Sequence, residues 1–350
     1  MKNIAELDKN FKIETNIDRD NLKFYNATDS NFSLHGVFHD GEGYVRMPKD
    51  AATATSKGVE GLFRHTAGGR LRFKTNSKYI AIHMKVSCIR RMVHMPLTGN
   101  TGFDLYVDGK FYRTFIPPVD AQNAYSGIHD LENQGSVHEI VINFPLYNEV
   151  DELYIGLEDT AEILPPEEYA TALPVVYYGS SITQGGCASR PGMSYQAILS
   201  NALNIDHINL GFSGNAKGEQ VMADYIANLK MSAFVLDYDH NAPNVEHLKA
   251  THEPFFKTIR NANPVLPILI LSKPKYYLTD DDIARRETIE QTYKNAVANG
   301  DKNVYFIEGN TLMREEIAEL GTVDGCHPTD LGFFSIAKRI EPILKEMLKL

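Results

Sequence analysis

Apolar and polar residues alternate in several short stretches of the first half of the chain. Clear examples are residues 70–75 and 79–86. Alternation with a period of two is typical of strands that bury one face, and several such strands separated by turns indicate an antiparallel sandwich. Asp108-Gly109, between two further runs of this kind, predicts a tight hairpin. We therefore expect residues 1–168 to form a β-sandwich domain.

The second half of the chain shows a different pattern, in which apolar runs of strand length alternate with helical segments. Strands are predicted at 174–179, 206–210, 233–238, 266–272 and 303–307, and helices at 193–203, 218–229, 245–261, 280–298 and from Asp330 onward. Asp330 suits the N-cap position of the last helix, along which Ile336, Ile340 and Leu344 recur every four residues. This succession predicts a parallel sheet with helices on both faces.

A short segment rich in proline and glutamate separates the two patterns. It spans residues 162–168 and contains Pro165 and Pro166. Such composition is typical of a linker. The sequence therefore predicts two domains, residues 1–168 and residues 169–350.

Composition excludes several classes of function. A formal net charge of −10 over 350 residues argues against a nucleic-acid or anionic-membrane surface, since both need clustered basic residues. Apolar stretches such as residues 266–271 are far shorter than a bilayer-spanning segment, which needs roughly 20 residues. Residues 1–8 lack the apolar core of a secretory leader, so we expect a cytoplasmic protein unless a leader has been removed.

The three cysteines, Cys88, Cys187 and Cys326, are odd in number and widely spaced. This favours reduced thiols over a disulfide framework or a zinc site. Cys326 could also be read as a nucleophile because it lies beside His327, but adjacent residues seldom turn their side chains toward each other. A small side chain that fills the loop is the simpler interpretation.

Residues 175–181 form an apolar, aromatic run that ends in Gly179-Ser180-Ser181. The pattern predicts a buried strand that breaks into a turn, where a serine hydroxyl can be held exposed at the edge of a sheet. Serines in such turns also commonly satisfy only turn or helix-cap hydrogen bonds. Ser181 is therefore a candidate nucleophile that needs support from elsewhere in the chain.

That support comes from Asp324 and His327, which lie three residues apart in a loop with glycine and proline. At this spacing the carboxylate can bond one imidazole nitrogen and leave the other free to accept a proton from serine. Gly214 and Asn241 each follow a predicted strand, and both offer N–H groups that can stabilise an oxyanion. Together these residues predict a serine hydrolase site.

The order Ser181, Gly214, Asn241, Asp324 and His327 resembles that of the SGNH hydrolases, also called the GDSL esterase family. Residues 179–183 stand where the family usually has Gly-Asp-Ser-[Ile/Leu]-Thr, with Ser180 in place of the aspartate. The third block also departs from the usual Gly-x-Asn-Asp, since Asp239-His240-Asn241-Ala242 stands there. Residues 102–106, Gly-Phe-Asp-Leu-Tyr, look like the motif of the small domain that precedes one branch of these esterases.

The resemblance implies a flavodoxin-like three-layer catalytic domain preceded by a jelly-roll-like β-sandwich. It also implies a short-chain serine esterase without a cofactor, with Ser181, Asp324 and His327 as the triad and the oxyanion held by Ser181, Gly214 and Asn241. Enzymes of this branch resemble carbohydrate esterases, so a small-molecule or oligosaccharide ester, most simply an acetyl ester, is the expected substrate. Two alternatives stay open, namely acyl transfer through the same acyl-serine and an inactive carbohydrate-binding protein.

Further residues are candidates for contacts with substrate. Arg190 and Tyr195 follow the nucleophile closely, and Asp239 adds a charge beside the third block. A loop of the first domain carries three more polar residues that could reach the cleft, Arg90, Arg91 and His94. Asp237, Asp239 and His240 could also be read as metal ligands, but no second ligand segment stands out, and we expect no metal.

Overall fold

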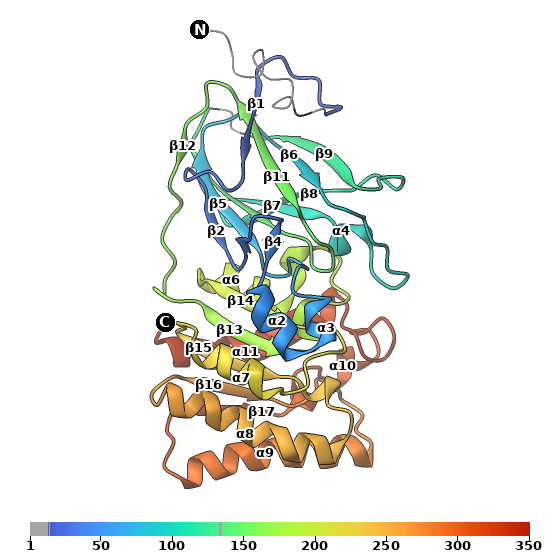
Figure 1. Cartoon of the computed structure of the whole chain (residues 1–350), viewed down its shortest axis with the longest axis vertical. Helices are drawn as coiled ribbons and strands as arrows, with labels where there is room; N and C mark the ends of the chain where they lie inside the picture. The colour runs from blue at the N-terminus through green and yellow to red at the C-terminus, as the bar shows by residue number, and fades with distance from the viewer. Residues whose placement is uncertain (1–12, 14, 133–134) are drawn as a thin grey trace.

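The computed structural model describes residue 13 and residues 15–132 and 135–350, and Figure 1 shows the chain as two stacked parts. The segment 1–8, from which the cellular location was predicted, lies outside the described residues. The upper part of the figure holds the antiparallel strands, and the lower part holds the parallel sheet and the long helices. The fold predicted from the sequence is confirmed.

The N-terminal part consists of two antiparallel sheets that enclose one core. One sheet has the order β1-β11-β6-β9, formed by Leu22–Asn26, Glu152–Glu158, Tyr79–Lys85 and Ala124–Asp130. The other has the order β12-β5-β10-β7-β8, formed by Ile163–Leu164, Arg70–Thr75, His138–Asn143, Phe103–Val107 and Lys110–Phe115, with β2 (Ser33–His35) beside β5. Alternate side chains from both sheets meet in a buried cluster that includes Phe73, Ile82 and Leu105.

The predicted hairpin joins β7 and β8. Asp108 and Gly109 have φ values of 51° and 74°. This is the backbone that a two-residue hairpin turn of this hand requires. A smaller pair, β3 (Phe38–His39) and β4 (Tyr44–Val45), leads into helices α2 (Lys49–Thr55) and α3 (Lys57–Glu60). A further helix, α4 (Leu97–Asn100), precedes β7.

The C-terminal part is a parallel sheet with the order β14-β13-β15-β16-β17. Its strands are His207–Gly211, Val175–Gly179, Ala233–Asp237, Ile268–Leu271 and Val304–Ile307, in that order. This is the flavodoxin-like order, in which the chain direction switches beside the first strand and leaves a crevice at the strands' carboxyl ends. The strands are buried on both faces, as their continuous apolar sequences require.

Helices cover both faces of this sheet (Figure 1). One face packs against α7 (Gln220–Ala227), α8 (Val245–Ala262) and α9 (Asp280–Ala298), and the other against α6 (Tyr195–Leu203) and α11 (Asp330–Leu348). Two four-residue helices, α5 (Ser181–Gln184) and α10 (Glu315–Ala318), complete the set. In the described part of the chain, no helix has both the length and the apolar character needed to cross a membrane.

The expected cap of the last helix is wrong by one residue. The N-cap of α11 is Thr329, and Asp330 is the first helical residue. The Asp330 carboxylate instead accepts hydrogen bonds from the backbone N–H and the hydroxyl of Ser189. It therefore ties the start of α11 to the loop that follows the candidate nucleophile.

Candidate active site

Ser181 lies at the start of α5, immediately beyond the carboxyl end of β13. Ser180 caps this short helix, because its side-chain oxygen accepts a hydrogen bond from the Ile182 N–H at 3.2 Å. The serine that replaces the family's aspartate thus has a local structural role. The strands on either side of β13 are β14 and β15, which carry Gly214 and Asn241 just beyond their ends.

The structure brings Ser181, His327 and Asp324 into one hydrogen-bonded relay. Ser181 Oγ lies 2.9 Å from His327 Nε2, and His327 Nδ1 lies 2.7 Å from Asp324 Oδ2. These are hydrogen-bond distances, and each imidazole nitrogen faces the partner that general-base catalysis requires. The geometry lets His327 take the serine proton while Asp324 holds the ring.

The Asp324 carboxylate is held in its charged form. Burial alone would raise its pKa, but the backbone N–H and imidazole of His327 and the Cys326 N–H bond to the carboxylate and lower the pKa to about 2. A negative charge therefore faces His327 at every pH at which proteins normally work. It can stabilise the imidazolium that forms when Ser181 loses its proton.

Gly214 and Asn241 flank Ser181 as oxyanion donors would. Gly214 has a φ of 70°, and its N–H has no hydrogen-bond partner among the described residues. Such a backbone conformation favours glycine. The Asn241 side-chain oxygen accepts a hydrogen bond from the Ala216 N–H at 3.3 Å, so the amide nitrogen is left to act as a donor. Both groups come from loops at the carboxyl ends of strands adjacent to β13.

Gln184 connects the loop that contains Gly214 to a loop of the N-terminal half. The sequence analysis did not single it out. Its side-chain oxygen accepts from the Ser213 N–H at 3.0 Å, and its nitrogen donates to the Leu146 carbonyl at 3.1 Å. Its side chain is fully buried at the end of α5. Gln184 therefore fixes the Gly214 loop against the nucleophile helix, and only its position three residues after Ser181 could have drawn attention to it.

Two residues of the N-terminal half also reach the site. Tyr147 donates from its hydroxyl to the Ser181 carbonyl oxygen at 3.0 Å, and the ring of His94 lies 5.7 Å from that of His327 between centroids. His94 was one of three first-domain residues that, from the sequence, could reach the cleft. The other two, Arg90 and Arg91, bond within the N-terminal half, to Glu149 and to the carbonyls of Val119 and Ala121.

The three candidate substrate-contact residues lie in other networks. Arg190 bonds Asp104 and Tyr106 of the N-terminal half, each at 2.8 Å. Tyr195 is fully buried and donates to Asp237 at 3.3 Å beneath the nucleophile turn. Asp239 is buried, accepts from the Lys273 N–H at 2.9 Å and faces Arg285. These contacts indicate support of the site rather than contact with substrate.

The alternative metal interpretation also meets a structural obstacle. Asp237 turns toward Thr183 and Tyr195, whereas His240 lies beside Cys326, with 3.7 Å between Nδ1 and Sγ. Burial lowers the His240 pKa to about 3. The described part of the chain holds no group of three or more residues arranged as metal ligands.

The thiols of Cys88, Cys187 and Cys326 are all unpaired in the structure.

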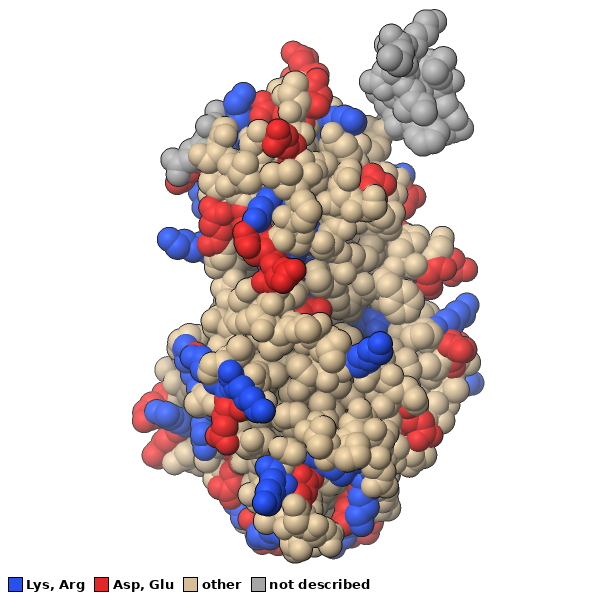
Figure 2. Space-filling model, turned by 90° about the vertical axis from the view of Figure 1, so that its left-hand side faces the viewer, with Lys and Arg blue, Asp and Glu red and all other residues tan. Residues whose placement is uncertain are grey.

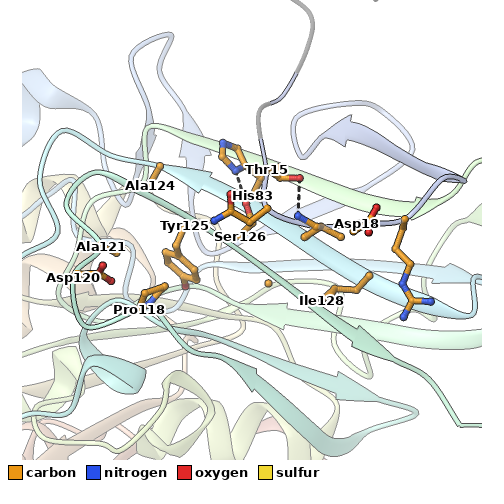
Figure 3. Close-up of a pocket in the computed structure, with 14 residues that line it drawn as sticks. Thr15, Asp18, His83, Pro118, Asp120, Ala121, Ala124, Tyr125, Ser126 and Ile128 are labelled. Carbon is orange, nitrogen blue, oxygen red and sulfur yellow. Dashed lines mark hydrogen bonds between the residues drawn. The ribbon is translucent and has the colours of Figure 1, made fainter.

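Two cavities, one within the N-terminal half and one at its boundary with the C-terminal half, lie away from the triad. One of about 580 Å³ occupies the N-terminal half between β9 and residues 15–19, and Figure 3 shows His83 and Ser126 on its wall. A second, of about 370 Å³, lies between the two halves. Neither is lined by Ser181, Asp324 or His327, so Ser181, itself 7% exposed, is not at the bottom of either.

Comparison with family models agrees with this geometry. Residues 172–345 match the GDSL-like lipase/acylhydrolase family, and residues 22–163 match the GxDLY family, the N-terminus of SGNH-hydrolase-type esterases. The chain belongs to the GDSL-like lipase/acylhydrolase family. Its N-terminal part is a GxDLY domain. No match was found among curated proteins.

Solved structures share the fold of both parts. A Bacteroides ovatus protein described as a GDSL-like lipase is 29% identical, with a TM-score of 0.85 over 94% of this chain and 98% of that one. The salicylyl-acyltransferase SsfX3 of a tetracycline biosynthetic pathway is 21% identical, with a TM-score of 0.76 over 95% and 99%. A family two carbohydrate esterase of Clostridium thermocellum, solved with cellohexaose, is 16% identical, with a TM-score of 0.61 over 81% and 93%.

Proposed function

We propose that this GDSL-family protein is a serine esterase that removes short acyl groups, acetyl above all, from carbohydrates. The observation that carries the proposal is the relay from Ser181 through His327 to Asp324, with the N–H groups of Gly214 and Asn241 on neighbouring strand ends. In the reaction His327 Nε2 accepts the Ser181 proton as Oγ attacks the ester carbonyl. The oxyanion is held by the Ser181 and Gly214 backbone N–H groups and the Asn241 amide.

The second half of the cycle uses the same groups. As the bond between the acyl carbon and the sugar oxygen breaks, His327 gives its proton to that oxygen, so the sugar leaves as an alcohol and an acyl-Ser181 intermediate remains. Water, deprotonated by the same imidazole, then attacks the acyl carbonyl, and collapse of the second tetrahedral intermediate returns the proton to Ser181. Each step needs only the triad and the oxyanion donors.

Two features support a small acyl group and a sugar alcohol. Four cavities in the described part of the chain, with volumes from about 340 Å³ to about 580 Å³, are lined by residues other than the triad. None of these four cavities is therefore placed to receive a long acyl chain from Ser181. The ring of His94 lies beside that of His327, the group that protonates the leaving alcohol in this mechanism. The carbohydrate esterase named above shares the fold and was solved with an oligosaccharide, which supports the substrate class.

The test compares acyl length and acceptor. Hydrolysis of p-nitrophenyl acetate, butyrate and octanoate should fall along the series, and acetate should be released from acetylated xylan or mannan oligosaccharides. Product analysis with added sugars or alcohols separates hydrolysis from transfer. Transfer to these acceptors in preference to water would replace the esterase proposal, and binding of acetylated sugars without any turnover would contradict an enzymatic function.

A further inference from the structure

The cavity between the two halves has features of a second binding site. One wall is the outer face of β5, β10 and β7, and the other is helix α6, with Tyr169 of the connecting segment. Its volume is about 370 Å³. That size lies in the range of small-ligand sites, which occur preferentially at domain boundaries. The cavity is lined by no residue of the triad and neither Gly214 nor Asn241.

The charged side chains on its walls are all paired, four of them with a group of opposite sign and Asp108 with an imidazole. Arg72 bonds Glu139 at 2.9 Å, and Arg70 is paired with Asp206. Glu167 is paired with Lys74, and Asp108 bonds His138 at 2.7 Å. Because these charges compensate one another, the cavity favours an uncharged ligand over an ion. On the outer face that Figure 2 displays, basic and acidic residues are interspersed.

Arg72 has N–H groups that donate to no acceptor in the described part of the chain. Its side chain is almost completely buried and its guanidinium lies over the Tyr169 ring, 4.0 Å from the centroid. In the described part of the chain, its hydrogen bonding is limited to Nη2, which donates to Glu139, and Nε is buried without a partner. Guanidinium carries five N–H groups, so the two Nη atoms of Arg72, a residue of the cavity wall, keep donors to which a ligand oxygen can supply an acceptor.

The remaining wall combines apolar surface with amide and hydroxyl groups. Val141 and Ala197 face the cavity from opposite sides, and Tyr106 and Tyr169 add aromatic surface. Asn143 donates to Asp104 at 2.7 Å, which leaves its side-chain oxygen as an acceptor, and Asn201 lines the opening. A ligand with many hydroxyls around a compact ring that has an apolar face meets all these groups.

We propose that the cleft between β10 and α6 binds an uncharged sugar unit of a glycan, separately from the catalytic centre. The site would hold the carbohydrate chain while an ester group elsewhere on it reaches Ser181. This inference goes beyond the proposed esterase function, because binding in the cleft needs no turnover.

The test uses the full chain with Ser181→Ala, so that no ester chemistry intervenes. Binding of unsubstituted xylotriose, cellotriose and mannotriose is measured by calorimetry and by saturation-transfer NMR. In this background Ala197→Phe fills the cleft from α6. Ala202→Phe, on an exposed position of the same helix outside the cleft, is the matched control. Asn201→Trp, at the exposed rim of the cleft, is a second blocking variant in case Ala197→Phe fails to fold.

We expect at least one trisaccharide to bind the background protein and Ala202→Phe equally, and to bind the blocking variants at least about tenfold more weakly. The inference is overturned if none of the three binds at millimolar concentration, or if a blocking variant binds as well as the control. The same substitutions with Ser181 intact should leave p-nitrophenyl acetate hydrolysis unchanged. Loss of that activity in every protein would contradict the esterase proposal and leave the binding result to stand alone.

Discussion

Arg190 Nη1 donates to Asp104 Oδ2 at 2.8 Å across the boundary between the two halves of the chain. Asp104 is the acid of the Gly102–Tyr106 motif, and it also accepts from the Gly192 N–H and the Asn143 amide, both at 2.7 Å. The motif that marks the N-terminal domain is therefore hydrogen-bonded to the loop that follows α5. The same loop bonds the other side of the site, since the Cys187 N–H donates to the Pro328 carbonyl at 3.1 Å.

Asp104→Asn should weaken both stability and catalysis. The carboxylate is fully buried, and removing one partner of a buried ion pair leaves the other charge uncompensated. Because the Arg190 side chain retains some exposure, we expect a loss of roughly 3 kcal/mol of unfolding free energy, together with a lower kcat as the loop loosens. Denaturant unfolding and ester hydrolysis measure the two effects.

The matched control is Lys110→Gln, which changes an exposed charge on the adjacent strand β8. It should leave both quantities unchanged. Equal stability of Asp104→Asn and wild type would show that the contact between the halves does not depend on this pair.

Asn241→Ala should lower kcat far more than it changes KM. The amide stabilises charge that develops only in the transition state, and one such donor is worth roughly 3–4 kcal/mol, or about 10²–10³ in kcat. Steady-state kinetics with p-nitrophenyl acetate give both constants. Asn261→Ala, an exposed asparagine on α8, is the control. A change confined to KM would argue against Asn241 as an oxyanion donor.

His94→Ala should affect the alcohol side of the substrate. The ring stands beside His327, which protonates the leaving group, and it comes from the loop of the N-terminal half. We expect kcat/KM for an acetylated sugar to fall about tenfold, whereas that for p-nitrophenyl acetate changes little because this leaving group needs less assistance.

Val93→Ala alters the fully exposed neighbour and serves as the control for His94→Ala. If both substrates lose activity to the same extent in His94→Ala, the residue supports the triad instead of the bound alcohol.

Asp237 should make stability fall as the pH rises from about 4 to 7. Burial, helped by the nearby Asp239 charge and opposed by the bonds from Thr183 and Tyr195, raises its pKa to about 7. Between the ordinary aspartate pKa and this value the folded state holds a proton that the unfolded state has lost, so unfolding becomes easier as the pH increases. Asp237→Asn removes this dependence.

The measurement is the unfolding free energy of wild type and Asp237→Asn across that pH range. Between pH 4 and pH 7, wild type should lose up to roughly 4 kcal/mol of unfolding free energy relative to Asp237→Asn. If the difference in unfolding free energy stays constant over this range, the Asp237 pKa in the folded protein is not raised above its ordinary value.

The order of the elements could be predicted from sequence because most have strong local signals. The apolar runs of β13 and β15 are continuous, and α9 begins with a capping box at Thr279 and Asp282. Their predicted ends agree with the structure to within about two residues, which is the usual uncertainty of such boundaries.

Helices α2 and α3 were not predicted, and neither was the place where they pack. Val59 and Phe63 come from the N-terminal half but are buried with Phe212 in the core on one face of the parallel sheet. Arg46 lies with them and donates to the carbonyls of Asn209 and Gly211. Local periodicity shows that a residue is buried, but it does not show against which sheet.

For the candidate active site too, the sequence did not show which distant segments are in contact. The sequence predicted that Ser181, Gly214 and Asn241 lie close together, because the carboxyl ends of parallel strands meet at one edge of a sheet. The sequence did not relate Tyr147 to the Ser181 carbonyl, and it gave His94 only as one of three residues that could reach the cleft, because these contacts depend on how the two halves dock. The bond from Arg190 to Asp104 could not be predicted for the same reason, and contact of Arg190 with substrate stays a prediction.

The central claim is tested most directly by p-nitrophenyl acetate hydrolysis in Ser181→Ala and Ser180→Ala. The two serines are adjacent, but one faces His327 and the other only caps α5. We expect Ser181→Ala to lose more than about 10³-fold in kcat, and Ser180→Ala to stay active with a loss of roughly 1 kcal/mol in stability. Activity that survives in Ser181→Ala would contradict its assignment as the nucleophile.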